Sequence, residues 1–210
     1  MSMSAIAIVL PPGWDFGEVS LNARGVTACQ LNLFGTGIGS FNDRIRSAVL
    51  GGSPFGDIQE QGFVTGLSLR PNDNSATMSS DEQLCKLQRY TEEIMASMAG
   101  GLRNYTYEAF SGRVCRGEDA GKVYRYDIKK GRGKKERLTF PNTRSGSPGS
   151  MCAYCATPSE LINYVSCHDN ETLFDSIQQK AVENMPLEER CRLNRLATSI
   201  VAFSQVLLVS

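Results

Sequence analysis

Short apolar, β-prone runs recur along the chain and are separated by longer stretches with helical periodicity. These runs predict strands at residues 5–10, 40–42, 162–165 and 206–209. Strands that alternate with helices are typical of an α/β fold, because a parallel neighbour is reached through a crossover connection that is usually a helix. We therefore predict an α/β protein whose strands run parallel.

Helical signals are clearest in three places. Ser80 and the acidic residues after it have the pattern of a capping box, and apolar residues then recur at helical spacing over 81–99. Pro186 stands in a first-turn position and begins a second helix over about 187–204. A third helical pattern opens at 170–172. We interpret the apolar stripes of the first two helices as core faces, which need no partner.

The segment 112–150 differs in composition from everything around it. It is rich in Gly, Ser, Lys and Arg, with basic or Gly/Ser-rich runs at 129–135 and 144–149. This composition predicts an exposed, irregular and mobile insertion within the domain. A basic run near aromatic residues is also compatible with binding of RNA or anionic lipid, although one short patch on a neutral chain favours a solvated loop.

Overall charge and hydropathy limit the classes of partner that we expect for this chain. The chain has 22 Lys+Arg and 22 Asp+Glu, so net charge gives no reason to expect nucleic acid or an anionic membrane as partner. A stretch of roughly 20 consecutive apolar residues, which a spanning helix requires, does not occur. We expect neither nucleic acid nor a membrane to be a partner.

The cysteines offer one alternative chemistry. Seven cysteines, an odd number, indicate reduced thiols more than a disulfide framework. Cys152 and Cys155 form a CxxC pair without a second pair at zinc-binding spacing, so we expect no metal and interpret them as loop cysteines, with a thiol or zinc module as the alternative. Cys167 beside His168 suggests a thiol–imidazole pair, but strand neighbours point to opposite faces, which favours a buried structural thiol.

Two further segments carry glycines or charges near predicted strands. The run 35–39 has three glycines but lacks the spacing of a nucleotide-binding loop, so we interpret them as allowing a close backbone approach. Asp43 is followed by Arg44 and Arg46 at a strand end. This pattern fits either a substrate contact or a structural ion pair, and we assign no catalytic role to it.

The most informative segment holds the only histidine of the chain. His168 and Asp169 follow the apolar run 162–165 and precede a helical pattern, so they lie at the carboxyl end of a predicted strand. In parallel α/β barrels that end of the strands is the active face. The pair is therefore the leading candidate for a functional site.

Three long segments resemble one family in the correct order. The segment "INYVSCHDNETLFD" at 162–175 resembles the last signature of the α-amylase clan of glycoside hydrolases, in the form typical of limit dextrinases and pullulanases. Segments 13–72 and 187–205 are similar to the same debranching enzymes. The resemblance implies a (β/α)₈ TIM barrel, which needs about 250 residues. We therefore expect residues 1–210 to be a fragment, roughly the second half of the catalytic barrel.

The resemblance also implies roles for individual residues. Asp169 matches the carboxylate that stabilises the transition state, and His168 matches the sugar-binding histidine of the family. The nucleophile is expected one strand before Met1. The family's proton donor is a Glu directly before Gly13, where this chain has Pro12. We therefore expect the chain to be inactive alone.

Substrate contacts are expected from aromatic side chains, because the C–H faces of glucose stack on aromatic rings. Trp14, Phe16 and Phe55 lie on segments that resemble substrate-facing loops. The resemblance implies a branched α-glucan such as starch, pullulan or limit dextrin, with α-1,6 hydrolysis and no cofactor, and a plastid location if it holds for the plant type. The alternative is a truncated, non-catalytic protein that binds α-glucan or associates with an enzyme.

Overall fold

The structure is a computed structural model of the 210-residue chain. It describes residues 30, 33–52, 56–110, 112–120, 123–130, 134–141, 152–168, 170–205 and 207–208. The candidate residues Pro12, Trp14, Phe16, Phe55 and Asp169 and the strand predicted at 5–10 lie outside these ranges.

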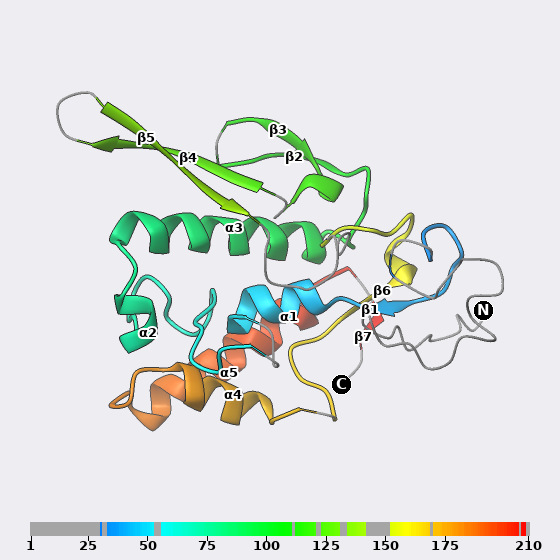
Figure 1. Ribbon diagram of the computed structural model, residues 1–210. Helices are drawn as coiled ribbons and strands as arrows, with labels where there is room; N and C mark the ends of the chain where they lie inside the picture. Colours follow the sequence, from blue (N-terminus) through cyan, green and yellow to red (C-terminus); the bar gives the residue numbers. More distant parts are fainter. Residues whose placement is uncertain are drawn as a thin grey trace, which may run out of the picture.

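Three strands that are far apart in the sequence form one parallel sheet. β1 (Ser40–Phe41) pairs with β6 (Leu161–Asn163), and β6 pairs with β7 (Leu207–Leu208), in the order β1-β6-β7 (Figure 1). Phe41 is in register with Ile162, and Ile162 with Leu207. The predicted parallel α/β arrangement is confirmed, with β1 and β6 each one residue shorter than predicted. Within the described ranges the sheet stays open, so barrel closure is not observed.

The helices predicted over 81–99, over about 187–204 and after 170–172 are confirmed, and two further helices, over Asp43–Leu50 and Asp73–Ala76, were not predicted individually. They are α1 (Asp43–Leu50), α2 (Asp73–Ala76), α3 (Ser80–Met98), α4 (Leu173–Lys180) and α5 (Leu187–Ala202). None of the described helices combines the length and the apolar content that crossing a bilayer requires.

The capping residue of α3 is Ser79, and the prediction of Ser80 is wrong by one position. Ser79 has extended backbone angles, and its hydroxyl accepts from the Glu82 amide at 3.3 Å, while a Glu82 carboxylate oxygen accepts from the Ser79 amide at 2.8 Å. A capping box needs a Glu or Gln three residues after the cap, and both Ser79 with Glu82 and Ser80 with Gln83 have that spacing. Gln83 instead donates to the carbonyls of Ser75 and Met78, so Glu82 completes the box with Ser79, and Ser80 is the first helical residue.

The core lies between the helices that flank the sheet. Its fully buried apolar side chains come mainly from α1, the following loop, α4 and α5, and include Ile45, Val49, Leu67, Ile177 and Ala197. A buried polar link joins the sheet to α3. Asn42 Nδ2 donates to Asn163 Oδ1 and to Ser97 Oγ, both at 2.9 Å, and Asn163 Nδ2 donates to the Ser97 carbonyl at 3.0 Å. These bonds satisfy buried amides whose burial is otherwise costly.

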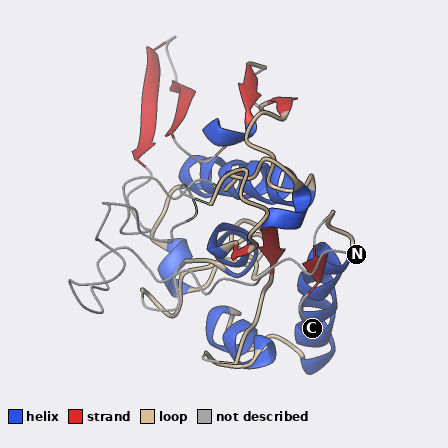
Figure 2. Ribbon diagram, turned by 90° about the vertical axis from the view of Figure 1, so that its right-hand side faces the viewer, coloured by secondary structure: helices blue, strands red, loops and turns tan. Residues whose placement is uncertain are grey.

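The prediction of irregular chain over 112–150 is wrong for part of that segment. β2 (Thr106–Glu108) and β3 (Val114–Arg116) form one antiparallel hairpin, and β4 (Val123–Lys130) and β5 (Lys134–Pro141) form a longer one. Both lie on one side of α3, opposite α1, α4 and α5 (Figures 1 and 2). The basic composition hides the β-prone residues Tyr124, Tyr126, Ile128, Leu138 and Phe140, which alternate along these strands.

Candidate functional site

The candidate site begins where β6 ends. β6 stops at Asn163, and the chain then runs as a loop to Thr172, whose hydroxyl accepts from the Asp175 amide at 3.2 Å and caps α4. His168 lies in this loop as an exposed turn residue. Because β1 and β6 are parallel, the loop lies at the same edge of the sheet as the carboxyl end of β1. The structure thus places His168 in the loop beyond the carboxyl end of β6, and its role in a site stays a prediction.

An ionic and aromatic cluster joins the ends of β1 and β6. Arg46 Nη1 lies 3.1 Å from Asp43 Oδ1 and donates to the Tyr164 hydroxyl at 2.5 Å, and that hydroxyl donates to Asp43. The Phe41 ring meets the Tyr164 ring edge to face, with centroids 5.1 Å apart. The Arg46 guanidinium also lies 5.3 Å from the centre of the Tyr164 ring. Two roles were predicted for this pattern, a substrate contact and a structural ion pair, and the ion pair of Asp43 with Arg46 is confirmed.

Burial determines the protonation state of Tyr164 in this cluster. It raises the pKa of Tyr164 well above its ordinary value, with Arg46 acting in the opposite direction and Asp43 adding to the increase. Tyr164 is therefore a neutral donor at physiological pH, as its bond to Asp43 requires. The cluster fixes the first residue after β6 against the end of β1 and the start of α1, and so positions the start of the His168 loop.

Cys167 lies in the loop beyond β6, so the alternation of strand side chains does not apply to it. It is half-buried, not fully buried as predicted, and its sulfur accepts from Asn170 Nδ2 at 3.3 Å.

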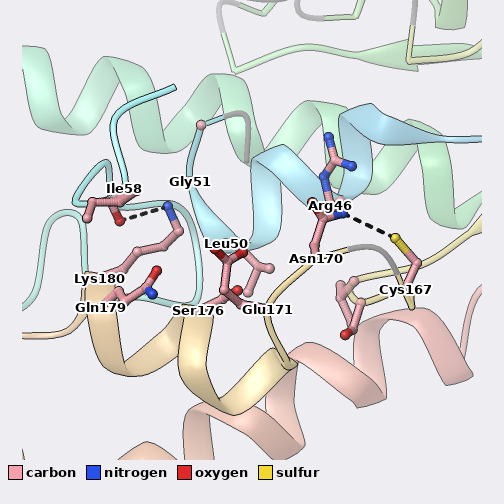
Figure 3. Close-up of a pocket in the computed structure, with 13 residues that line it drawn as sticks. Arg46, Leu50, Gly51, Ile58, Cys167, Asn170, Glu171, Ser176, Gln179 and Lys180 are labelled. Atoms are coloured by element: carbon pink, nitrogen blue, oxygen red, sulfur yellow. Dashed lines mark hydrogen bonds between the residues drawn. The ribbon is translucent and has the colours of Figure 1, made fainter. Parts of the chain in front are cut away.

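A pocket adjoins the loop between α1 and α4 (Figure 3). Its cavity volume is small, about 40 Å³. It is lined by loop residues, by the end of α1 and by α4, namely Arg46, Leu50, Gly51, Gly52, Ile58, Val165, Ser166, Cys167, Asn170, Glu171, Ser176, Gln179 and Lys180. Sequence reasoning missed this pocket, because its residues come from segments more than 100 positions apart.

The CxxC pair is packed inside the protein. Cys152 and Cys155 are each 1% exposed, and Cys152 Sγ donates to the Ala120 carbonyl at 3.5 Å. Burial raises the pKa of Cys155 to about 12 and also raises that of Cys152. Both thiols are therefore protonated near neutral pH, whereas metal binding and thiol exchange use the thiolate. Among the described residues, no group of three or more His, Cys, Asp or Glu side chains is placed to hold a metal ion.

The glycine run at 35–39 binds a carboxylate of the protein itself. Glu160 accepts from the Gly37 amide at 2.8 Å, from the Gly35 amide at 3.2 Å and from the Ala156 amide at 2.8 Å. Gly35 and Gly37 have φ values of 75° and 74°, which favour glycine. Successive backbone amides of this kind form an anion-binding concavity. The contact lies before β1 and β6, at the edge of the sheet opposite His168.

Of the predicted site residues, the structure places His168 alone. Trp14, Phe16, Phe55 and Asp169 lie outside the described residues, so their grouping with His168 stays a prediction.

Comparison with known proteins gives one consistent relationship. No family model matches the chain. Pullulanase 1, chloroplastic, from Arabidopsis thaliana is 43% identical over 193 residues, which are 92% of this chain and 17% of that protein. The pullulanase of Klebsiella aerogenes is 36% identical over 197 residues, which are 92% of this chain and 15% of the relative.

Solved structures agree with this relationship. Apo pullulanase from Klebsiella pneumoniae has a TM-score of 0.72 at 31% identity, over 98% of this chain and 19% of that one. Pullulanase from the same organism complexed with maltotriose has a TM-score of 0.67 at 33% identity, over 88% of this chain and 15% of that one. The chain thus spans less than a fifth of the length of these relatives. Over nearly all of its own length, this protein is homologous to one segment of the pullulanases.

Proposed function

We propose that the chain forms part of the (β/α)₈ catalytic barrel of an α-1,6-glucan debranching glycoside hydrolase, acting on branched α-glucans such as starch, pullulan and limit dextrin. The observation that supports this most directly is the parallel order β1-β6-β7 with the His168 loop at its carboxyl edge, in a chain 43% identical to a chloroplastic pullulanase. That relative also supports a plastid location.

The proposed chemistry divides between His168 and Asp169. The exposed imidazole of His168 can exchange hydrogen bonds with sugar hydroxyls, because a neutral imidazole has one donor and one acceptor nitrogen. Asp169 directly follows it, and a carboxylate there would stabilise the positive charge of an oxocarbenium-like transition state. Arg46, Asp43 and Tyr164 hold the strand ends and therefore act as positioning residues.

Hydrolysis by this chain alone is not expected. A retaining glycosidase needs a nucleophile and a proton donor as well as Asp169, and Pro12 stands where the resemblance places the donor Glu. The expected result is no release of reducing sugar from pullulan by the purified chain. Release that disappears in Asp169→Ala would contradict this expectation, and Asp169→Ala also controls for contaminating activity.

Binding tests the proposed site without requiring turnover. We expect the chain to bind maltotriose and His168→Ala to weaken that binding about threefold to tenfold, the range for one lost hydrogen bond between neutral groups. Asn104→Ala, which changes an exposed turn residue beyond α3, should leave the affinity unchanged. The affinities are measured by isothermal titration calorimetry.

The binding outcomes test the site. Binding that is weakened in His168→Ala, with no hydrolysis, supports the proposed site and agrees both with a segment of a catalytic barrel and with the alternative of a non-catalytic glucan-binding or enzyme-associating protein. Absence of binding to maltotriose and amylopectin would reject both a glucan-binding role and the proposed site.

A further inference from the structure

The β2–β3 hairpin packs on α3 through a second core that is smaller than the main one. Figure 1 shows the hairpin beside α3, on the side away from α1. The buried residues of this core are mostly short, namely Ala96, Tyr107, Ala109, Ala120, Cys152 and Ala153, with Cys115 packed against them. Hydrophobic stabilisation grows with the apolar area that is buried. Apolar contacts alone therefore hold this hairpin less firmly than leucine and isoleucine side chains hold the main core.

One buried carboxylate joins α3 to the hairpin. Glu92 belongs to α3 and is 3% exposed. Its Oε2 atom accepts from the Tyr107 hydroxyl of β2 at 3.2 Å. Its Oε1 atom accepts from the amide of Phe110, in the turn after β2, at 3.0 Å. Both carboxylate oxygens are thus used, and Glu92 bonds the hairpin to the helix at two points.

The charge of Glu92 is not balanced by an ion pair with any described residue. The guanidinium groups of Arg89 and, from α1, Arg44 favour the charged form of Glu93, its neighbour on α3. The described titratable and charged groups around Glu92 are Tyr107 of β2, Cys115 of β3, Cys152 before β6 and Glu93 on α3, and beyond Cys115 the opposite charges of Arg113 and Asp119. A buried carboxylate in such surroundings is costly in its charged form.

Burial and hydrogen bonding act on Glu92 in opposite directions. Burial favours the neutral acid, whereas the bonds from Phe110 and Tyr107 favour the carboxylate. Burial has the larger effect, so the pKa of Glu92 is raised above its ordinary value of 4.5. The packed hairpin therefore favours the protonated form more than a detached hairpin does. Packing is strongest below that ordinary pKa, where Glu92 is neutral in both states, and weakens as pH rises through the raised pKa.

We propose that Glu92 is a pH-sensitive contact, which holds the β2–β3 hairpin on α3 when it is neutral and loosens the hairpin when it is ionised. The neutral carboxyl group keeps both bonds, because its carbonyl oxygen accepts from the Phe110 amide and its hydroxyl exchanges a hydrogen bond with Tyr107. Ionisation leaves a buried charge without a counter-ion. The contact lies on the side of α3 opposite α1, α4 and α5, and it does not depend on glucan binding.

The test is amide hydrogen exchange of the full chain between about pH 5 and about pH 8, expressed as protection relative to an unstructured chain at the same pH. The Phe110 amide reports on the contact with Glu92. The Val64 amide, which donates to the Val49 carbonyl at 2.9 Å, reports on the main core. We expect the protection of Phe110 to fall as pH rises, while that of Val64 stays level.

Two variants of Glu92 separate its charge from its hydrogen bonds. Glutamine is neutral throughout and keeps an acceptor for the Phe110 amide and a donor for Tyr107. Phe110 protection in Glu92→Gln should therefore be independent of pH and exceed that of the parent chain at about pH 8. Glu92→Ala removes both bonds and should lower Phe110 protection about tenfold or more at the acid end. Glu108→Gln is the matched control, because Glu108 is exposed on β2, and it should keep the pH dependence of the parent chain.

Three results would overturn the proposal. The first is Phe110 protection that does not change with pH in the parent chain. The second is a pH dependence that survives unchanged in Glu92→Gln. The third is an equal fall for Phe110 and Val64, which would show that the whole domain opens and not the hairpin. Maltotriose is absent from these measurements, so a failure of the proposed glucan site would leave their outcome unchanged.

Discussion

Gly51→Ala is expected to destabilise the protein by at least about 4 kcal/mol, among the largest effects of a single substitution. Gly51 ends α1 with φ of 101°, and an added Cβ would lie 2.1 Å from the Glu60 carbonyl oxygen and 2.3 Å from the Gln61 carbonyl carbon. Both atoms belong to the backbone, so a rotamer change cannot relieve the overlap. Because domains are typically stable by 5–15 kcal/mol, urea unfolding should show a much earlier transition or its loss.

The backbone of residues 60–62 lies close to Gly51, and this approach brings hydrogen-bond donors to the end of α1. The Phe63 and Val64 amides donate to the carbonyls of Ala48 and Val49 at 2.9 Å each, and the Thr65 hydroxyl donates to the Leu50 carbonyl at 2.8 Å. The last carbonyls of a helix have no partner within it. The segment after Gln61 supplies these partners, and a side chain at Gly51 would push it away.

Two matched glycine variants separate backbone strain from lack of space. Gly112→Ala has φ of 74° with nothing within 4 Å of the new Cβ, so it should cost only about 1–2 kcal/mol. Gly62→Ala brings a Cβ to 2.3 Å from the Gly51 nitrogen outside the positive-φ region, and overpacking of this kind costs typically about 1–3 kcal/mol. Equal stabilities of Gly51→Ala and Gly112→Ala would contradict the packing argument.

The spacing of apolar residues was sufficient to predict two of the helices and two strands of the sheet. The apolar spacing over 81–99 and 187–204 corresponds to α3 and α5, and the short runs at 40–42 and 162–165 correspond to β1 and β6. These elements bury one stripe or face in the core, which is the feature that periodicity records. The β4–β5 hairpin was missed, because its Lys and Arg residues dominate the composition from which that segment was judged.

The candidate site was predictable only where it is continuous in sequence. His168 and Asp169 are adjacent, and Asp43 and Arg46 lie one helical turn apart. The bond between Tyr164 and Asp43 joins residues 121 positions apart, and the pocket joins three separate segments. Such contacts depend on strand order, which a single sequence does not contain. The role of Glu160 was missed for the same reason.

Glu160→Gln is expected to destabilise the protein by about 2–4 kcal/mol near neutral pH. Glu160 is 3% exposed, and its carboxylate accepts the amides of Gly35, Gly37 and Ala156. A glutamine has one acceptor oxygen and places an NH₂ donor against the remaining amides, which leaves buried donors unsatisfied. The variant would thus loosen the entries to β1 and β6 together. Chemical unfolding at pH 7 measures the difference.

The pH dependence identifies the carboxylate charge as the cause. Burial alone would raise the pKa of Glu160, but the amides of Gly37, Ala156 and Gly35 together hold it below the ordinary value of 4.5. A group with a lowered folded pKa stabilises the protein above its unfolded pKa, and this contribution is lost as pH falls through the folded pKa. The difference between the parent chain and Glu160→Gln should therefore be full at pH 7 and shrink below roughly pH 4.5.

Glu183→Gln is the matched control, because Glu183 is exposed in the turn between α4 and α5. Its stability should stay within about 0.5 kcal/mol of the parent chain, as for most surface substitutions. A Glu160→Gln difference that persists unchanged in acid would mean that side-chain shape, and not charge, holds the two strand entries. A parent-like Glu160→Gln at pH 7 would mean that the amides of Gly35 and Gly37 find other partners, and that the strand entries are held by the surrounding backbone.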